Sequence, residues 1–274
     1  MKFQISPYGD TIRDLKPFNL TMFHISGCQI SWKTLLLFRT CATVFHWLIL
    51  MVRLREPERL PAFCYLTNIV YLICTLYYTI AVYSTFYELV IEKKVPIYNK
   101  VFQNPHIFRM DKLCYEERSP ASKGLLRYIQ WVMHSIALNM GILVSVMYFL
   151  LIYDPSKETL GLTNVSRHIL NSLCILTEFS LNMISVKFAQ ISYSLVIAAV
   201  YAVYTYLFWY IVEPPENYIY KIVDWGEPVK TGVLIVLLMC ALSVLHLLLV
   251  GISRIKLKYM HILPLNESSH TVLV

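Results

Sequence analysis

The sequence predicts an all-α membrane protein: a bundle of six transmembrane helices with both termini in the cytosol. The 274 residues are 57% hydrophobic and only 15% charged, whereas soluble domains average about 45–50% apolar and about 25% charged residues. The apolar residues gather in runs of about 20 residues, the length that a helix needs to cross a bilayer. These runs are continuous rather than alternating, which favours helices over a transmembrane β-barrel.

The first three runs each end at a polar or charged segment. The first run, TLLLFRTCATVFHWLILMV, stops at the charged stretch RLREPER. The second begins at AFCYLTN and ends at FYELVI, before a long basic segment. The third is YIQWVMHSIALNMGILVSVMYFLLIY. We expect these spans at about 34–52, 62–91 and 128–153.

The last three runs complete one membrane domain. The fourth, SRHILNSLCILTEFSLNMI, is the least apolar, the fifth halts at EPPEN, and the sixth is VKTGVLIVLLMCALSVLHLLLVGI. We expect spans at about 166–184, 188–212 and 229–252. The domain would then cover 34–252, between an N-terminal arm at 1–33 and a tail at 253–274.

Basic residues outside the spans predict the orientation. Lys and Arg concentrate in the arm, in the loop 92–127 and in the tail, and cytosolic segments carry such an excess. Of three glycosylation sequons, at Asn19, Asn164 and Asn266, only Asn164 then lies on the glycosylating side. Asn164 is therefore the one possible glycosylation site of the three, and a glycan on Asn19 or Asn266 would contradict the orientation.

Composition also excludes several classes of function. The net charge of +7 is explained by the Lys and Arg residues that set membrane orientation. The sequence has no basic run interleaved with aromatic residues, so nucleic-acid binding is not expected. The seven cysteines form no C-x-x-C pair and no metal-spaced cluster with histidine. We therefore expect no metal, no cofactor and no disulfide framework.

Polar residues inside the spans are the candidates for function, because they are costly in a bilayer. Those of the fourth span recur at steps of three or four, so they share one helical face that should turn inward. Arg39, one turn inside the first span, is expected to snorkel to the cytosolic interface. Glu178 needs a partner or a raised pKa. The inward face comprises His168, Asn171, Ser172, Ile175, Glu178 and Asn182.

Packing the second span against this face would bring Thr67 close to it. A threonine hydroxyl is a weak nucleophile that needs a base, and His168 can take a proton near neutral pH. Asn68 or Asn171 would donate to an oxyanion, with Ser172 and Glu178 lining the same cavity. The alternative is structural, because such side chains also hydrogen-bond ordinary membrane helices together.

Three short motifs stand out: YLTN at 65–68, RHILNSL at 167–173 and YIYKIVDWGEPVKT at 218–231. In these motifs the chain resembles the protein rolling stone family of invertebrate multi-pass membrane proteins, with Lys221 at a position where that family usually has proline. The resemblance implies a plasma-membrane protein, with the endoplasmic reticulum as the alternative location, that acts in myoblast fusion. The basic loop 92–127 would then contact membrane lipids or a protein partner.

A more distant resemblance is to the androgen-induced six-span threonine hydrolases, which cleave fatty acid esters of hydroxy fatty acids. Their nucleophile lies in a Phe-Leu-Thr motif, which Tyr65-Leu66-Thr67 matches. Their base is the second histidine of His-Gly-x-His, and here Asn171 stands at that position. An amide cannot act as a general base, so His168, one turn earlier, is the candidate base. This resemblance implies the alternative function, an intramembrane threonine hydrolase of lipid esters.

Overall fold

The computed structural model describes residues 32–56, 60–87, 121–156, 161–182, 184–214 and 217–262. These residues form helices and connecting turns without a β-strand, which confirms the all-α fold class. The sequons at Asn19 and Asn266, most of the N-terminal arm and most of the basic loop lie outside the described residues.

The first half of the described chain holds three long helices. Helix α1 covers Trp32–Arg55 and α2 covers Leu66–Phe86, preceded by the short 3-10 helix η3 at Ala62–Cys64. Helix α5 covers Ala121–Met147 and continues into the π-helical segment η5 at Tyr148–Ile152. Helix α5 therefore begins inside the segment 92–127 that was expected to be loop.

The fourth expected span is a composite of short elements. Helix α6 covers Leu162–Val165, the π-helical segment η6 covers Ser166–Leu170, and α7 covers Asn171–Leu181. The 3-10 helix η7 at Phe188–Gln190 leads into α8 at Ile191–Ile211, and α9 covers Pro228–Ile262.

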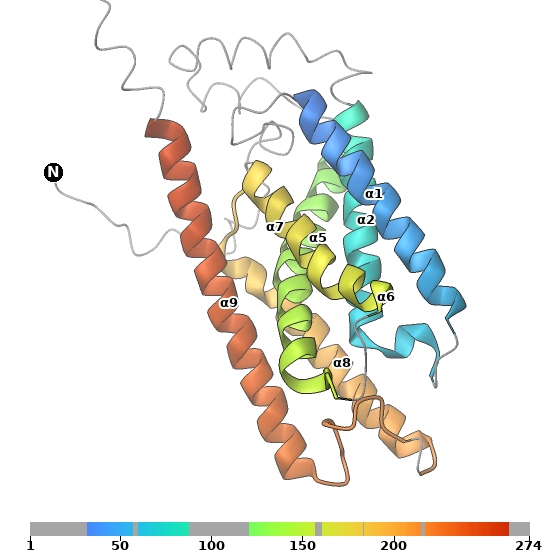
Figure 1. Cartoon of the computed structure of the whole chain (residues 1–274). Helices are drawn as coiled ribbons and strands as arrows, with labels where there is room; N and C mark the ends of the chain where they lie inside the picture. Colours follow the sequence, from blue (N-terminus) through green and yellow to red (C-terminus); the bar gives the residue numbers. More distant parts are fainter. Residues whose placement is uncertain are drawn as a thin grey trace, which may run out of the picture.

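Five of the described helices are long and apolar enough to cross a membrane: α1, α2, α5 with η5, α8 with η7, and α9. The composite α6–η6–α7 lies among them, in contact with α1, α2 and α5 (Figure 1). The start of α1 and the end of α9 lie at the same end of the bundle (Figure 1). The number of six spans stays a prediction, because the composite fourth segment is not among the five helices that qualify. The assignment of that end to the cytosol stays a prediction.

Helix α9 extends past 252, the expected end of the sixth span, and the first residues of this extension have partners. Ser253 is buried and its hydroxyl accepts a hydrogen bond from the backbone N–H of Val186 at 3.0 Å. The ammonium of Lys256 donates to the backbone carbonyl of Asn182 at 2.9 Å. The side chain thus satisfies a carbonyl at the C-terminal end of α7.

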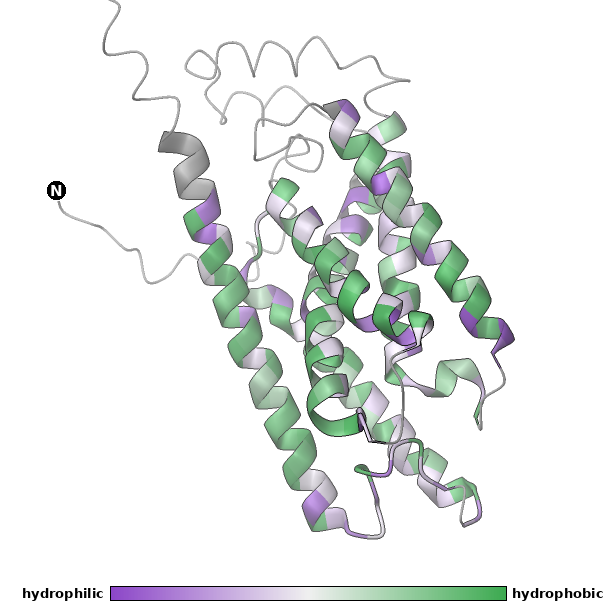
Figure 2. Cartoon of the chain, in the orientation of Figure 1, coloured by the Kyte–Doolittle hydropathy of each residue, from purple (hydrophilic) through white to green (hydrophobic). Residues whose placement is uncertain are grey.

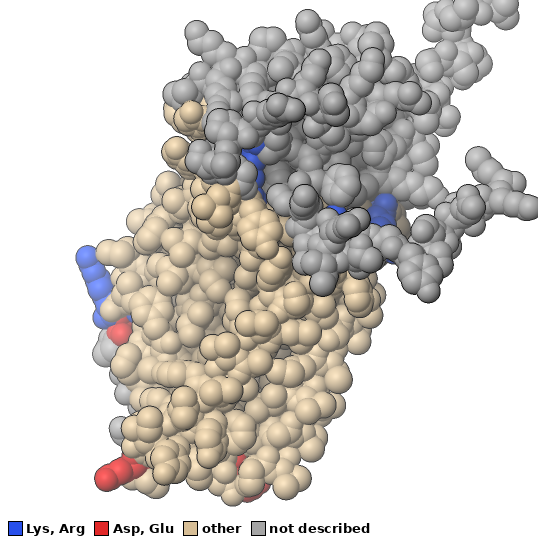
Figure 3. All heavy atoms as spheres, turned by 180° about the vertical axis from the view of Figure 1, so that it is seen from behind, with Lys and Arg blue, Asp and Glu red and all other residues tan. Residues whose placement is uncertain are grey.

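The outer surface of the bundle suits contact with lipid. Exposed valines and leucines follow α8 and α9, among them Val196, Val200, Val236 and Leu237, and the helices are apolar over most of their length (Figure 2). Seen from behind, the described surface is largely uncharged, with charged side chains at its margins (Figure 3). Such a surface fits a polytopic membrane protein.

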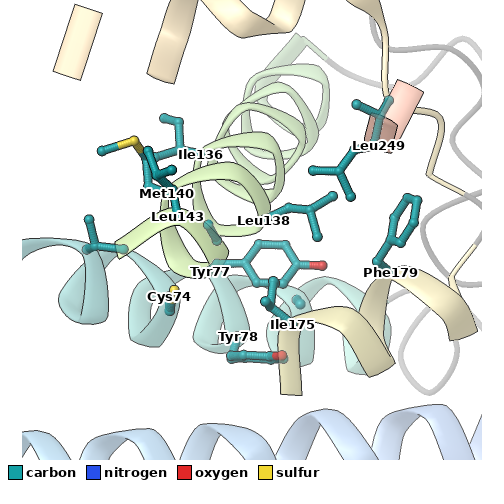
Figure 4. Packing of buried hydrophobic residues seen from close by; sticks show 14 of the residues in the cluster. Cys74, Tyr77, Tyr78, Ile136, Leu138, Met140, Leu143, Ile175, Phe179 and Leu249 are labelled. Carbon is teal, nitrogen blue, oxygen red and sulfur yellow. The ribbon is translucent and has the colours of Figure 1, made fainter. Parts of the chain in front are cut away.

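The core lies where α2, α5 and α7 meet. Tyr77 and Tyr78 of α2 pack with Leu138 of α5 and with Ile175 and Phe179 of α7 (Figure 4). All five side chains are buried. Because this contact holds three separate segments together, it fixes α2 and α7 relative to the central helix α5.

Candidate functional site

The first turn of α2 is held by tyrosines from α8 and from the turn between α8 and α9. The helix has no side-chain cap of its own. Instead, the backbone N–H of Leu66 donates to the hydroxyls of Tyr201 and Tyr220, at 3.1 Å each. Tyr201 in turn donates to the carbonyl of Cys64 at 2.8 Å. These bonds satisfy groups that a helix start leaves open, and they fix the position of Thr67.

Tyr220 is held next to Leu66 because hydrogen bonds stabilise the turn between α8 and α9. The carboxylate of Asp224 accepts a hydrogen bond from the N–H of Gly226 at 2.8 Å, and Trp225 donates to the Thr205 hydroxyl at 3.2 Å. Pro228 opens α9, where its missing N–H costs nothing. Burial raises the pKa of Tyr220 above its ordinary value, so the phenol stays neutral beside Thr67. The motif at 218–231 thus builds the support for α2.

Two cavities meet at Thr67. One is apolar, has a volume of about 140 Å³ and extends between α5, α8 and α9. The other has a mixed lining that includes charged and amide side chains, and is called the polar cavity below; it has a volume of about 890 Å³ and lies against the end of α1 and the start of the composite fourth segment. Thr67 lines both of them and is 9% exposed. The other residues lining both are Tyr148, Leu151, Ile152, Tyr220 and Ile222.

His168 lines the polar cavity together with Thr67. Its ring stacks on Tyr148, with centroids 3.8 Å apart and planes at 5°. Tyr148 belongs to the π-helical segment η5 and His168 to the π-helical segment η6, so the stacked rings join these two segments at the cavity wall. Within the described structure His168 Nδ1 has no hydrogen-bond partner, and the histidine is not bonded to Thr67. π-Helical turns occur frequently at functional sites.

Asn68 and Asn164 bind a guanidinium at the same cavity. Arg167 donates to Asn68 Oδ1 at 2.8 Å and to Asn164 Oδ1 at 2.6 Å. The amide nitrogen of Asn68 donates to the carbonyl of Ala62 at 2.6 Å. Both ends of the Asn68 amide are therefore engaged within the protein, and its oxyanion role stays a prediction. So does the glycan on Asn164.

Two other predicted site residues contact neighbouring helices. Asn171 turns toward α1, where its Oδ1 lies 3.0 Å from His46 Nε2. Ser172 donates to the Ser145 hydroxyl at 2.8 Å. Neither residue lines the two cavities that meet at Thr67. The pairing of Asn171 with His46 was not foreseen, because the sequence gives no sign that two spans so far apart in the chain are neighbours.

Glu178 lies in the core in an ion pair with Arg39, and both side chains are fully buried. Arg39 Nε donates to the carboxylate at 3.0 Å, and the hydroxyl of Tyr77 donates to it at 3.0 Å. The expectation that Arg39 snorkels to the interface is therefore wrong, because a carboxylate on α7 lies within its reach. Glu178 has the partner that the sequence required but did not identify.

Sequence reasoning missed the arginines of the polar cavity. Arg53 and Arg167 both line it, yet at the ends of apolar runs they resemble ordinary topology residues. The signal was present for Arg167, which opens the motif RHILNSL. For Arg53 the sequence shows only that the residue lies at the end of the first span, close in the chain to the start of the second.

Protein rolling stone of Drosophila melanogaster is a curated relative of this chain. Over 160 residues the chain is 21% identical to protein rolling stone of Drosophila melanogaster, in an alignment that covers 57% of this chain and 58% of the relative. The chain thus spans a little over half the length of the relative it matches. No protein-family model and no solved structure matches the chain. The chain is therefore an all-α, multi-pass membrane protein that is similar to protein rolling stone.

Proposed function

We propose that this protein binds a lipid within the membrane, with the lipid chain in the apolar cavity and the polar part in the polar cavity. The observation that carries the proposal is the place of Thr67, which lines both cavities. An amphiphile has the same division between an apolar and a polar end. A cavity of about 150 Å³ accepts a ligand such as benzene, so the apolar cavity has room for part of one acyl chain.

Photo-crosslinking tests this proposal. The purified full-length protein is incubated with a fatty acyl ester that carries a diazirine near the chain end, and the labelled peptides are identified by mass spectrometry. We expect labels on residues lining the apolar cavity in α5, α8 and α9. Ala198→Trp, which fills that cavity, should abolish them. Ala199→Trp is the matched control, because Ala199, the next residue on α8, is exposed and does not line the cavity. Equal labelling of both variants overturns the proposal.

A second candidate is hydrolysis of lipid esters, favoured because Thr67 and His168 line the same cavity. In this reaction Thr67 Oγ attacks the ester carbonyl while His168 takes the hydroxyl proton. The proton then passes to the leaving alcohol, and an acyl-threonine forms. Water attacks that ester with the histidine again as base, which releases the fatty acid and restores the hydroxyl.

A fluorophosphonate probe tests hydrolysis directly. The probe should label Thr67 in the folded protein, and labelling should vanish in Thr67→Ala and in His168→Ala. Thr67→Ser should retain it, and Thr79→Ala, on the same helix, should label like the wild type. A folded wild type without labelling and without turnover of fatty acid esters of hydroxy fatty acids contradicts the enzymatic role.

The biological setting that we propose is cell–cell fusion, in particular of myoblasts, or a related developmental membrane process. Its support is the similarity to protein rolling stone, because the resemblance to that family implies a role in myoblast fusion. Fusion of cells that lack the protein should be restored by the wild-type chain. Rescue by Thr67→Ala means that fusion does not require hydrolysis, whereas rescue by Ala198→Trp means that it does not require the lipid.

A further inference from the structure

The apolar cavity is long and narrow. Its lining residues on α8 lie between Ala198 and Thr205, and those on α9 lie between Ile235 and Leu242. At 1.5 Å per residue, each of these ranges covers about 10 Å along its helix axis. A volume of about 140 Å³ spread over that length makes a channel rather than a round chamber. This shape fits a straight hydrocarbon chain better than a ring system.

Small side chains on α8 provide the space in this channel. Ala198 and Ala202 are one helical turn apart, so they lie on the same face of α8, and both line the cavity. The other helices contribute larger side chains, such as Met140 of α5 and Leu242 of α9. Ser194, one turn before Ala198, is fully buried and does not line the cavity. On α8 the cavity therefore ends at Ala198.

The same end of the cavity is closed on α5 and α9. Toward this end the last lining residues are Met140 and Leu242, and both are buried. Beyond them Asn139 and His246 are fully buried, and Asn139 Oδ1 lies 3.1 Å from His246 Nδ1. His246 Nε2 also lies 3.1 Å from the backbone carbonyl of Phe188. This layer joins α5, α9 and η7, so a chain that enters the cavity ends below it.

The opposite end of the cavity meets the polar cavity at Thr67. A ligand whose polar part lies at Thr67 therefore has only the length of the apolar cavity for its chain. A cavity of about 150 Å³ accepts benzene, a ligand of six carbons. The volume of about 140 Å³ has room for a similar number of carbons.

We infer that the apolar cavity selects lipids by the length of one straight acyl chain, which ends at a wall formed by Met140, Ala198 and Leu242. The inference rests on the proposed lipid binding and names the class of lipid, one with a short or medium acyl chain. Each methylene that fits below this end wall is buried and strengthens binding. A further methylene meets packed side chains, and overpacking costs free energy.

Competition against the photoreactive acyl ester tests the chain length. The purified full-length protein in an uncharged detergent is labelled in the presence of straight-chain methyl esters, from the butanoate to the hexadecanoate. We expect competition to improve about fourfold for each added methylene. The improvement should stop at the hexanoate to octanoate esters, when the cavity is full. Competition that keeps improving up to the hexadecanoate overturns the inference, because the chain then leaves the cavity.

A variant that fills the closed end tests the end wall itself. In Ala198→Leu the best competitor should become shorter by about two carbons, and the octanoate ester should compete about tenfold less well. Ala199→Leu is the matched control, because Ala199 is exposed and does not line the cavity. Both variants are measured in the same detergent, so partition of the esters into micelles affects them equally.

A variant that opens the closed end should have the opposite effect. Leu242→Ala removes most of a side chain from the end wall, so the best competitor should become longer by about two carbons. Leu237→Ala is the matched control, because Leu237 on the same helix is 61% exposed and does not line the cavity. If Leu242→Ala fails to fold, Ala198→Leu and the wild-type series decide.

The outcomes separate the inference from the proposal on which it rests. If no ester competes and the photoreactive ester does not label the cavity residues, lipid binding as a whole is overturned. If the esters compete but chain length has no effect, lipid binding is kept and selection by length is overturned. If Ala198→Leu prefers the same chain length as Ala199→Leu, the chain does not end at this wall and the inference is overturned.

Discussion

At the scale of single residues, the polar groups inside the spans divide into two sets. One set joins helices: Arg39 with Glu178, His46 with Asn171, and Ser172 with Ser145. The other set, with Thr67 and His168, lines the polar cavity. The residue types were visible in the sequence, but their partners were not, because a partner lies on a span far away in the chain.

The buried ion pair between Arg39 and Glu178 predicts a strong effect of losing one partner. Glu178→Gln leaves the arginine buried without its counter-charge, so we expect a loss of about 3–5 kcal/mol in the free energy of unfolding. Arg39→Met should cost a similar amount for the same reason. Thermal and denaturant unfolding in detergent measures both.

The double variant Arg39→Met with Glu178→Gln is the control for this prediction. It buries no charge, so it should be clearly more stable than either single variant. If the two single losses simply add in the double variant, the ion pair does not have the role described here.

At the scale of elements, the start of α2 shows how distant segments place a single side chain. The runs themselves could be predicted from hydropathy, since five of them coincide with long apolar helices. The hydrogen bonds from Leu66 to Tyr201 and Tyr220 could not be predicted from hydropathy, because they join α2 to α8 and to the turn before α9. The broken fourth segment was foreseeable only as the least apolar run.

Removing the tyrosine hydroxyls should loosen the first turn of α2. Leu66 has two acceptors, so Tyr201→Phe or Tyr220→Phe alone should cost about 1 kcal/mol or less, and the double variant more. Hydrogen exchange of the amides of Leu66, Thr67 and Asn68 should quicken. The exposed Tyr206→Phe on α8 should change nothing. Unchanged exchange in the double variant contradicts this account of the helix start.

At the scale of the whole molecule, the described ends of the chain share one end of the bundle (Figure 1). The polar cavity is lined from the opposite ends of α1 and α5, by Arg53 and by Tyr148 to Pro155. The predicted orientation, with the termini in the cytosol, would place this cavity on the outside of the cell or in the lumen. The distribution of Lys and Arg in the loops predicts that orientation. The cavity could not be predicted in this way, because it depends on side-chain packing that a hydropathy profile does not show.

Cysteine labelling tests the orientation. Ser156→Cys, in the exposed turn after η5, should react with a membrane-impermeant maleimide on intact cells. Lys33→Cys, at the start of α1, should react only after permeabilisation. The wild-type protein provides the background from its own cysteines. The reverse pattern, or a glycan on Asn19 or Asn266, contradicts the orientation.

The central claim is that one lipid occupies both cavities and passes Thr67. An experimental map of the protein purified with its native lipids and reconstituted in nanodiscs measures this directly. We expect elongated density between α5, α8 and α9 that passes Thr67 and continues into the polar cavity. A map in which side chains close the apolar cavity, or in which ordered lipid lies only on the outer surface of the bundle, contradicts it.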